Sequence, residues 1–559
     1  MENYLFNDTE NYFYSKSPDP FSYKDAGDTE KNLFEIISNS KDKSVFSQEL
    51  MSRAHDWPTY YHLTSLRSNI LRPFENKIKF GSTLELGAGC GAVTRFIGEL
   101  GGKVTAVEGS MARARVIGAR CIDLPNVEVV ADLIQNFKTT EKFDVVTLIG
   151  VLEYSRLYVK SEDPVQTMLE LARSYLKPDG IVVLAIENQM GLKYFCGAPE
   201  DHFGCPMFGV NNSYKENSIV TFGRKELSDR CKRAGFDSVK LYVPVPDYKT
   251  PVSIIYPDGF SENANDAGWD IAPILSGAVF VDRQNPVHPT FSLEAALTLA
   301  ANNGLGQDLA NSFLFELGNQ VNDINKNVLA AHYGTQRPAK YSKETRFSMN
   351  VNGVTTHTRY VSDTPNLDNA PWDPSIYHSG AHWHSELIRL VNRPIWSMKD
   401  LAGWAGVWIN ALKKHATLGA ETTIPELAHY KHLLPDNFID ATPANFIVKN
   451  SNEDFFFDLE WNLSKAIPLE FVVFRGLFMS FIRITSCARP EQDVPMKLVE
   501  LIQGIMNIHR LEILKNDWEL FLHIFNSFQN QTQDISGDVL NEHTSQIATE
   551  FLKVRQLFT

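Results

Sequence analysis

Residues 83–91 read Thr-Leu-Glu-Leu-Gly-Ala-Gly-Cys-Gly, a short apolar run that passes into a loop with glycine at every second position. The run has the character of a buried strand, and the residues after the loop have the spacing of a helix. Glycine permits a tight turn and lets a ligand approach the backbone where a Cβ would stand in the way. The stretch therefore predicts a ligand site at a strand–loop–helix junction, although dinucleotide-binding domains use a similar loop.

The sequence around this loop alternates between short apolar runs and helical patterns. Such alternation predicts a mostly parallel sheet covered by helices on both faces. A helix over 224–234 should end at Gly235, and strand-like runs at 239–243, 252–255 and 278–281 should complete the sheet. We therefore predict an α/β domain over residues 51–285. The strands predicted in its first part are residues 83–86, 104–108, 127–130, 143–149 and 180–186.

Two acidic residues follow the loop, at the ends of the next two predicted strands. Glu108 stands where a carboxylate can accept both hydroxyls of a ribose, and Asp132 stands where an acid can receive an adenine amino group. The turn Leu-Lys-Pro-Asp-Gly at 176–180 directly precedes the fifth strand. As an ordered set with the E-L-G-x-G-x-G loop, these features resemble the class I S-adenosylmethionine-dependent methyltransferases over about residues 80–190.

This resemblance implies a Rossmann-like, seven-stranded methyltransferase sheet with S-adenosyl-L-methionine as its cofactor. The loop glycines would line the methionine moiety, with Glu85 close to its amino group. Glu108 would hold the ribose and Asp132 the adenine, while Gly150 and Val151 would flank the cofactor. The cofactor-binding residues implied in this way are Glu85, Gly87, Ala88, Gly89, Gly91, Glu108, Gly109, Asp132, Gly150 and Val151.

The methyl acceptor in such folds binds at the carboxyl ends of the strands, beside the cofactor. A polar loop over residues 187–202 falls there, and His202 in it is the first candidate for a general base, with Asp201 to orient it. Glu153, after the fourth strand, is the alternative base, and a loop histidine without a chemical role is the competing interpretation of His202. Transfer from a sulfonium mainly requires alignment of donor and acceptor, so we expect no covalent intermediate and no metal ion at this site.

Further motifs resemble a narrower group, the methyltransferases of bacterial surface-polysaccharide and O-antigen clusters, over about residues 55–255. That resemblance implies a sugar hydroxyl, or a phosphate on a sugar, as the acceptor within a saccharide or glycolipid-linked chain. It also implies other polysaccharide-assembly enzymes as partners. The motifs are Trp-Pro-Thr-Tyr-Tyr-His-Leu at 57–63, Glu-Gly-Ser at 108–110 with Arg-Ala at 113–114, Glu-Asn-Gln-Met-Gly-Leu-Lys-Tyr at 187–194, Glu-Asp-His at 200–202 and Pro-Asp-Tyr-Lys at 246–249.

A second pattern lies near the C-terminus, where Asp440 is followed by Asn445 and, after a further strand, by Asp458. This arrangement resembles the catalytic and metal-binding loops of the protein-kinase-like fold. In that resemblance Asp440 would contact an acceptor hydroxyl, Asn445 and Asp458 would bind Mg²⁺ with ATP, and Glu386 would match the helix glutamate.

The same region departs from the kinase pattern in three ways. No glycine-rich loop occurs near 345–361, where a hairpin is expected around Asn352-Gly353. No lysine lies on the expected strand, where Arg359 is the nearest cation, and Asp-Leu-Glu at 458–460 replaces Asp-Phe-Gly. Three interpretations stay open, namely an inactive kinase-like domain, an unrelated helical domain and an active kinase.

Composition narrows the class of protein. A formal net charge of −14 argues against a general nucleic-acid binder, whose basic surface displaces phosphate counterions. Six cysteines without a C-x-x-C pair argue against a common zinc site and fit a reducing compartment. No secretory signal and no apolar run of about 18 residues is present. We expect a cytoplasmic bacterial enzyme, with peripheral attachment to the inner face of the membrane as a variant.

The predicted organisation is an N-terminal extension over 1–50, the methyltransferase domain over 51–285, a mainly helical, kinase-like α+β domain over 286–480 and a helical tail over 481–559. One helix is predicted in the extension, near residues 31–40, and a helical pattern runs over 57–74. Residues 286–340 are predicted to be mainly helical, and two short strands are predicted at 445–448 and 454–458. The leading function is methylation of a saccharide. The alternatives are a bifunctional methyltransferase–kinase that modifies a chain end and a non-catalytic assembly scaffold, which predicts no binding of the cofactor.

Overall fold

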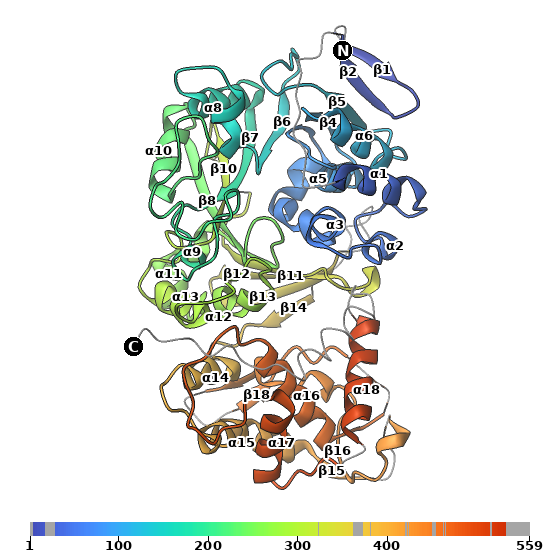
Figure 1. Cartoon of the computed structure of the whole chain (residues 1–559), viewed down its shortest axis with the longest axis vertical. Helices are drawn as coiled ribbons and strands as arrows, with labels where there is room; N and C mark the ends of the chain where they lie inside the picture. The colour runs from blue at the N-terminus through green and yellow to red at the C-terminus, as the bar shows by residue number, and fades with distance from the viewer. Residues whose placement is uncertain are drawn as a thin grey trace.

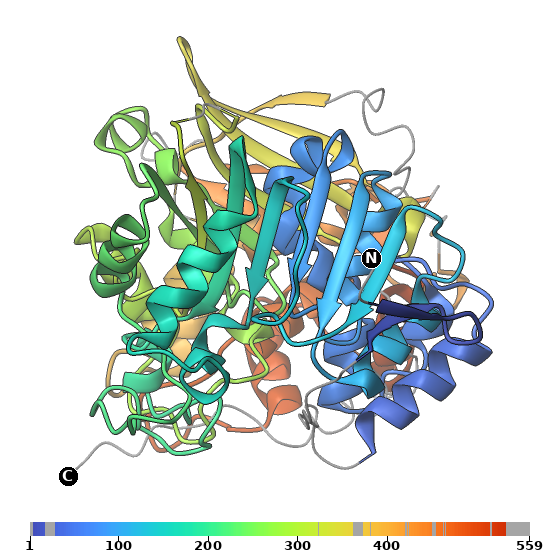
Figure 2. The same cartoon turned by 90° about the horizontal axis from the view of Figure 1, so that it is seen from above.

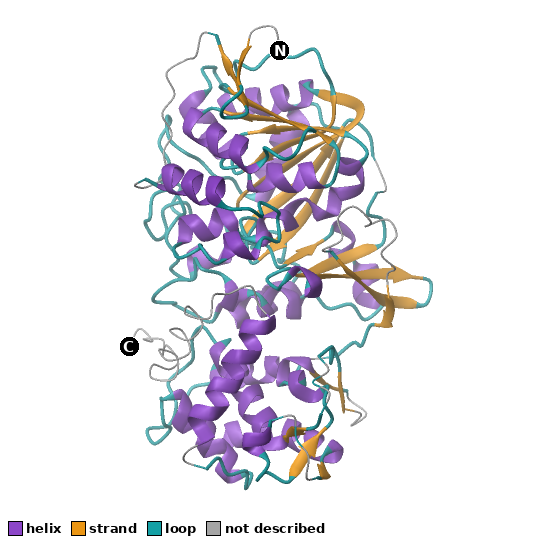
Figure 3. Cartoon of the chain, turned by 90° about the vertical axis from the view of Figure 1, so that its right-hand side faces the viewer, coloured by secondary structure: helices purple, strands orange, loops and turns teal. Residues whose placement is uncertain are grey.

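An α/β region and a mainly helical region make up the molecule, with an antiparallel sheet between them (Figure 1). Strands are concentrated in the α/β region and helices fill the other (Figure 3). The computed structural model describes residues 4–16, 28–321, 324–361, 373–380, 382–419, 422, 424–449, 454–461, 463, 465–514 and 517–532.

Five parallel strands form the centre of the α/β region, as the sequence predicts. The chain runs outward from β3 through β4 to β5, then crosses back to the other side of β3 and continues through β6 to β7. The strand order therefore reverses beside β3, and ligands of open α/β sheets bind at such a point. The bounds are β3 (Ser82–Leu86), β4 (Lys103–Glu108), β5 (Val127–Ala131), β6 (Phe143–Ile149) and β7 (Leu176–Glu187).

Helices cover both faces of this sheet (Figure 2). Successive side chains of a strand point to opposite faces, so Val104 and Ala106 of β4 enter one apolar core while Val107 enters the other. Phe96 and Ile117 close the first core, and Leu169 closes the second. The covering helices are α5 (Ala92–Glu99), α6 (Met111–Arg120), α8 (Pro164–Ser174) and α10 (Arg224–Arg233).

Two more strands extend this sheet, and one of them was not predicted. β8 (Ser238–Val245) confirms the run at 239–243, whereas β10 (Ser312–Gly318) lies between β7 and β8 and pairs antiparallel with both. The helical prediction for this segment is wrong. All seven residues of β10 are buried, and a strand buried on both faces lacks the alternation that identifies strands. The sheet thus draws on sequence beyond residue 285.

The strand predicted at 278–281 is also wrong. α12 (Ala272–Gly277) and the 3₁₀ turn η4 (Val279–Val281) occupy this segment, and Val279 packs in a core beside Leu275. A run of four apolar residues fits a turn of buried helix as well as a strand, so its pattern alone does not decide.

β8 continues into a second stretch of sheet. Its last residues pair with β9, and the order then runs β9-β11-β12-β13-β14 with antiparallel pairing throughout. β12 and β13 form the predicted hairpin, in which Gly353 has φ 111°. Together these strands and the central ones make one sheet of 14 strands. The bounds are β9 (Ser253–Ile255), β11 (Val328–Gly334), β12 (Lys343–Asn350), β13 (Gly353–Tyr360) and β14 (Asp373–Ile376).

The N-terminal residues add a hairpin to the other edge of the sheet. α1 (Thr29–Asn39) confirms the single helix predicted in this extension. β1 (Tyr4–Asn7) and β2 (Tyr12–Ser15) were not predicted, and β2 pairs parallel with β5. The helical segment predicted at 57–74 divides into α3 (Trp57–Leu63) and the 3₁₀ helix η1 (Ser65–Phe74). Other short elements are α2 (Gln48–Met51), α4 (Glu75–Lys79), η2 (Leu152–Tyr154), α7 (Ser155–Tyr158), α9 (Leu192–Phe195), η3 (Pro257–Phe260), α11 (Glu262–Asp266) and η5 (Ala339–Tyr341).

The C-terminal region packs its helices around one apolar core, to which Trp408, Phe474 and Phe521 contribute. The two predicted short strands appear as the hairpin β17 (Phe446–Val448) and β18 (Asp454–Phe456). Residues 533–559 of the predicted tail lie outside the described residues. The other elements are α13 (Leu293–Asn302), α14 (Trp383–Val391), α15 (Met398–His415), β15 (Thr417–Leu418), η7 (Pro425–Leu427), β16 (His432–Leu434), η8 (Phe438–Asp440), η9 (Pro443–Asn445), β19 (Ile467–Pro468), α16 (Leu469–Ile482), α17 (Leu498–Ile508) and α18 (Asp517–Thr532). In the described part of the chain, no helix combines the length and apolar character needed to cross a membrane.

Candidate active site

The glycine loop lies between β3 and α5, at the carboxyl end of the sheet. Gly87 and Gly89 both have positive φ, at 78° and 57°. A Cβ on Gly87 would stand 2.5 Å from Cγ2 of Val151, so this position has room only for glycine. At Gly89 no atom lies within 4 Å of a built Cβ. That open space leaves the backbone accessible to a ligand.

Glu108 holds the loop in place from the end of β4. Its carboxylate accepts hydrogen bonds from the backbone N–H of Gly89 at 2.8 Å and of Ser110 at 2.9 Å. A carboxylate has about four acceptor positions, and these two bonds alone do not fill them. Its predicted role with the ribose is compatible with this geometry.

Glu85, the last acid before the loop, is almost fully buried and accepts a hydrogen bond from Oγ1 of Thr94 at 2.6 Å. Burial raises the pKa of Glu85 to about 8, because its charged form is poorly solvated there, although the bond from Thr94 opposes the shift. An ammonium group beside Glu85 would supply the missing counter-charge. This is the position that the family resemblance assigns to the amino group of the cofactor.

These residues open into a cavity of about 460 Å³, a size typical of small-molecule sites. Most of the predicted cofactor residues line it together with Glu153, Asp201 and His202. The lining residues that the sequence did not single out for the site include Arg67, Arg113 and Gln284. The predicted site residues in the lining are Glu85, Gly87, Ala88, Gly89, Glu108, Gly109, Gly150, Val151, Glu153, Asp201 and His202.

Two predicted cofactor residues are not among the residues that line this cavity. Gly91 begins α5 with φ 77°, and a Cβ there would press on Ile117 at 3.2 Å, so its role in this structure is close packing. The carboxylate of Asp132 accepts a hydrogen bond from the hydroxyl of Tyr4 at 2.8 Å and another from the backbone N–H of Leu133 at 2.8 Å. Leu133 itself lines the cavity.

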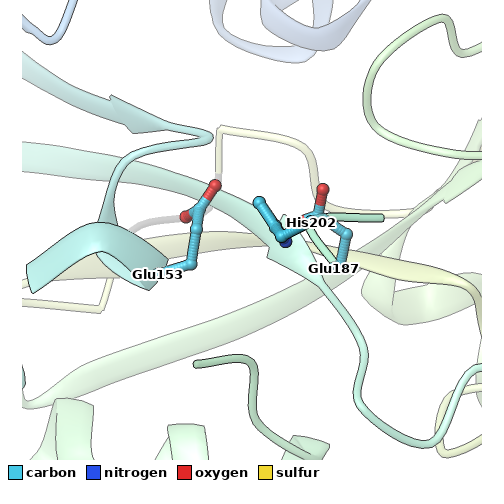
Figure 4. A group of neighbouring side chains, drawn as sticks. All are labelled: Glu153, Glu187 and His202. Carbon is cyan, nitrogen blue, oxygen red and sulfur yellow. The ribbon is translucent and has the colours of Figure 1, made fainter. Parts of the chain in front are cut away.

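Beside Gly150 in the lining of the cavity, Glu153, Glu187 and His202 converge from three separate segments (Figure 4). One ligand atom from each lies within 4.8 Å of the other two. Burial and the nearby charge of Glu187 raise the pKa of Glu153 to about 8. Burial disfavours the charged form of His202, but the hydrogen bond to Glu200 and the charges of Glu187 and Glu153 raise its pKa to about 9.

Glu200, rather than the predicted Asp201, orients His202. Its carboxylate lies 3.3 Å from Nδ1 of His202 and accepts the backbone N–H of the same residue at 2.8 Å. The backbone N–H of Phe203 donates to it as well, at 2.8 Å. The sequence Glu-Asp-His offers two adjacent acids, and only the local turn decides which of them reaches the ring.

Asp201 instead belongs to a buried network with two lysines. Nζ of Lys249 donates to Asp201 at 2.9 Å and to Glu187 at 2.5 Å, and the hydroxyl of Tyr194 also donates to Asp201. Nζ of Lys193 lies 3.8 Å from Asp201. Burial favours the neutral acid, but the two lysines hold the pKa of Asp201 below its ordinary value. Sequence reasoning gave Glu187 and Lys249 no role in the site. The only sequence signal for them is that they belong to the motifs at 187–194 and 246–249.

The second predicted site, in the C-terminal region, is partly assembled. Oδ1 of Asp440 pairs with Nη2 of Arg475 at 2.6 Å, and the side-chain amide of Asn445 donates to the carbonyl of Asp440 at 3.0 Å. Asp458, in the left-handed region at φ 54°, lies 2.8 Å from Nζ of Lys343. The prediction that no lysine lies on the expected strand is therefore wrong. β12 begins at Lys343, two residues before the predicted hairpin at 345–361.

Two other residues named for this site have different neighbours. Arg359 of β13 is buried and bonds to Glu344 of β12 and to Glu75 of α4, so it links the antiparallel sheet to the α/β region. Glu386 of α14 pairs with Arg389 on the same helix.

A comparison with protein-family models agrees with the first site. The family model described as a methyltransferase domain matches residues 84–182. No curated protein matches the chain. Three solved structures with low similarity are a possible histamine N-methyltransferase from Thermotoga maritima, the glycopeptide N-methyltransferase MtfA in complex with S-adenosylmethionine, and the N-terminal domain of EvdMO1 with bound S-adenosylhomocysteine.

The three structures are 17–18% identical in sequence to this chain. The Thermotoga protein is 17% identical over 46% of this chain and 91% of its own, with a TM-score of 0.26. MtfA is 18% identical over 32% of this chain and 80% of its own, with a TM-score of 0.24. The EvdMO1 domain is 18% identical over 33% of this chain and 76% of its own, also with a TM-score of 0.24. The family model therefore places a methyltransferase domain at residues 84–182, and the strand order and the glycine loop held by Glu108 agree with it.

Proposed function

We propose that the chain transfers a methyl group to an oxygen atom of a saccharide or glycoconjugate. The observation that carries this proposal is the position of Glu153 and His202, which line the cavity beyond Gly150. A Cβ on Gly150 would stand 3.6 Å from Oε1 of Glu153, so this carboxylate adjoins the residue predicted to flank the cofactor. A hydroxyl acceptor benefits from such a group, because its oxygen attacks effectively as its proton leaves.

S-adenosyl-L-methionine supplies the methyl group, and its sulfur is the leaving atom. In the proposed step the acceptor oxygen bonds to the methyl carbon as the carbon–sulfur bond breaks, and the hydroxyl proton passes to Glu153. We assign the base to Glu153 rather than to His202 on geometry. The carboxylate of Glu153 adjoins Gly150 and its Oε2 has no hydrogen-bond partner, whereas the pairing of His202 with Glu200 favours the protonated imidazole ring. His202 would then position the acceptor.

The saccharide class rests on the narrower set of sequence motifs, whose residues meet at this end of the cavity. Lys249 from one motif bridges Glu187 and Asp201 from two others. Lys193 bonds to Asp247 at 3.0 Å, which links the motifs further. Tyr61 and Trp57, from the first motif, line the same cavity, and aromatic residues in a site suit the binding of sugars. Residues far apart in the sequence thus build one acceptor end.

The test is transfer of labelled methyl groups from S-adenosylmethionine to a panel of nucleotide sugars, lipid-linked oligosaccharides, phosphorylated oligosaccharides and amines. We expect incorporation into a saccharide, with ³¹P NMR separating a methyl phosphate from a methyl ether. Glu153→Gln should lower the rate about 100-fold or more with unchanged affinity for S-adenosylhomocysteine. The exposed residue Glu216 provides the matched control, Glu216→Gln. Labelling of amines alone, or full activity in Glu153→Gln, would overturn the proposal, and failure to bind S-adenosylhomocysteine would favour the scaffold alternative.

A second candidate function is phosphoryl transfer in the C-terminal region, and the position of Lys343 favours it. Nζ of Lys343 lies 2.8 Å from Asp458 and 2.6 Å from Oε2 of Glu460. In protein kinases the lysine that contacts the phosphates pairs with the helix glutamate, close to an acid that binds Mg²⁺. Here Lys343 lies beside the predicted metal-binding acid, although Glu386 pairs with Arg389 instead of the lysine. The pair makes the kinase-like interpretation more specific than the sequence did.

Binding of ATP–Mg²⁺ by calorimetry tests this candidate on the full chain. We expect Asp458→Ala and Lys343→Met each to weaken binding by about tenfold or more, while the exposed Lys399→Met leaves it unchanged. If the wild type binds no ATP–Mg²⁺, the C-terminal region is not a kinase.

A further inference from the structure

The three side chains at the acceptor end, Glu153, Glu187 and His202, have the composition and spacing of a metal site. Each offers one ligand atom, and the three atoms lie within 4.8 Å of one another. Ligands of an octahedral ion at about 2.2 Å lie about 3 Å apart when adjacent and about 4.4 Å apart when opposite. We propose that Glu153, Glu187 and His202 bind a divalent cation of the Mn²⁺ class, which holds the oxygens of the methyl acceptor. This inference rests on the proposed function.

Two oxygen atoms of this group have no partner in the described structure. Oε2 of Glu153 and Oε2 of Glu187 accept no hydrogen bond, and water cannot replace the missing partners because each residue is only 1% exposed. A buried carboxylate oxygen without a partner costs free energy, so such atoms usually mark a missing donor or ion. Among the described residues, Glu153 also makes no ion pair. A divalent cation would satisfy both oxygens and balance both negative charges.

The neighbours of His202 and Glu187 orient these two side chains as hydrogen-bond partners commonly orient metal ligands. The carboxylate of Glu200 lies 3.3 Å from Nδ1 of His202, which leaves Nε2 as the nitrogen available to a cation. A histidine that binds a metal commonly donates its other ring N–H to a carboxylate in this way. The second oxygen of Glu187, Oε1, accepts from Nζ of Lys249 at 2.5 Å and from the hydroxyl of Tyr248 at 3.2 Å. One oxygen of Glu187 is therefore fixed while the other is left for a ligand.

The ligand set indicates which ion would bind. Two carboxylates with one imidazole suit Mn²⁺ better than Mg²⁺ or Ca²⁺, which prefer oxygen ligands alone. Three protein ligands leave about three coordination positions open, and the group faces the cavity beside Gly150. Two neighbouring hydroxyls of a sugar could take two of those positions.

In the methyl transfer, such an ion would orient the acceptor and favour loss of its proton. Oε2 of Glu153 would bind the cation, and Oε1, which adjoins Gly150, would receive the hydroxyl proton. The acceptor oxygen then bonds to the methyl carbon as the carbon–sulfur bond breaks. The balance of atoms is unchanged from the reaction proposed above, and the ion undergoes no change of oxidation state.

Electron paramagnetic resonance of Mn²⁺ added to the full chain tests the site without any substrate. We expect one Mn²⁺ bound per chain, with ¹⁴N hyperfine coupling from the imidazole. His202→Gln should abolish the ¹⁴N coupling, and Glu153→Gln should weaken Mn²⁺ binding by about tenfold or more. Glu216→Gln, which removes an exposed carboxylate, should change neither signal, and circular dichroism confirms that the variants are folded.

Absence of bound Mn²⁺ in the wild type, or binding that is equal in Glu153→Gln, would overturn the metal site. Binding without ¹⁴N coupling, or coupling retained in His202→Gln, would also overturn it, because His202 would then not be a ligand. These outcomes are independent of the proposed function. A chain that methylates saccharides equally well after chelation and without bound Mn²⁺ would refute only the metal, while failure of methyl transfer in a chain that binds Mn²⁺ through His202 would refute only the reaction.

Discussion

The hydroxyl of Tyr4 donates a hydrogen bond of 2.8 Å to the carboxylate of Asp132, and so joins the first strand of the chain to the end of β5. Asp132 is the acid predicted to receive the adenine amino group. Each carboxylate oxygen accepts up to two hydrogen bonds, so the bond from Tyr4 leaves capacity for a second donor.

Asp132→Asn should therefore weaken binding of S-adenosylhomocysteine about tenfold, because an amide nitrogen or a single carbonyl replaces the acceptor pair. Tyr4→Phe removes one donor that is not part of the predicted adenine contact, and should weaken binding less than about threefold. Isothermal titration calorimetry measures both. Equal effects of the two substitutions would mean that Asp132 serves to dock the N-terminal hairpin and does not contact adenine.

Glu108→Ala should have the largest effect on cofactor binding. The substitution removes the acceptor for the N–H groups of Gly89 and Ser110 as well as the predicted ribose contact. Losses of charged hydrogen bonds are worth about 1.5–3 kcal/mol each, so we expect affinity for S-adenosylhomocysteine to fall by at least about tenfold. Glu128→Ala on the adjacent strand β5, outside the lining of the cavity, is the control and should bind normally. Normal binding by Glu108→Ala would remove this residue from the cofactor site.

Cofactor binding should depend on pH through Glu85. In the free protein its pKa is about 8, so the carboxyl group is mostly protonated at pH 7. The ammonium group predicted beside it favours the charged carboxylate and lowers that pKa, so binding releases a proton below about pH 8. Affinity should rise with pH from 6 to 8, by at most about tenfold per unit, and then level off.

Calorimetry in two buffers with different heats of ionisation measures the released proton. Glu85→Gln resembles the protonated form and should bind with little dependence on pH over the same range. If wild type and Glu85→Gln release the same number of protons, the cofactor's amino group does not lie beside Glu85.

Lys249→Met should lower the thermal stability of the chain. The ammonium of Lys249 pairs with Glu187 and Asp201, and its side chain is 14% exposed, so its removal leaves two buried carboxylates without that partner. Breaking a buried pair from one side costs about 3–5 kcal/mol. The matched control is Lys225→Met, since Lys225 pairs with Asp229 but is 86% exposed.

A thermal-shift assay should show a clear fall of the unfolding temperature for Lys249→Met and almost none for Lys225→Met, because exposed pairs contribute little. Adding Asp201→Asn to Lys249→Met should restore part of the loss, since one uncompensated charge is removed. Equal unfolding temperatures for the two lysine variants would contradict the buried network as a source of stability.

The sequence predicted the parts of the fold that depend on local pattern. The five parallel strands, the hairpin at Gly353 and the helix α1 each have a period or a turn residue that identifies them. β10 and the segment 278–281 were assigned incorrectly for one shared reason. Neither alternates regularly between polar and apolar residues, and only pairing with β7 and β8, or its absence, decides between strand and helix.

The residues of the candidate site divide in the same way, between those that a local pattern identifies and those that only the fold brings together. The glycine loop and Glu108 are adjacent to strands and are identified by spacing. Glu187, Glu200 and Lys249 act through contacts made across the fold, and no spacing reveals that Lys249 reaches Glu187 across 62 positions. Lys343 was missed because the hairpin was predicted from the turn at Asn352-Gly353 to begin at residue 345, whereas β12 begins at Lys343.

β8 pairs with β10 through its first residues and with β9 through its last, so one strand belongs to both halves of the sheet. A gene fragment that ends at residue 285 would encode β7 and β8 without the strand that lies between them. Its product would expose two unpaired edges in the middle of a sheet, and such edges promote aggregation. Expression of the methyltransferase half alone therefore requires sequence through β10 at least, and separation of the two candidate activities is better made by single substitutions than by truncation.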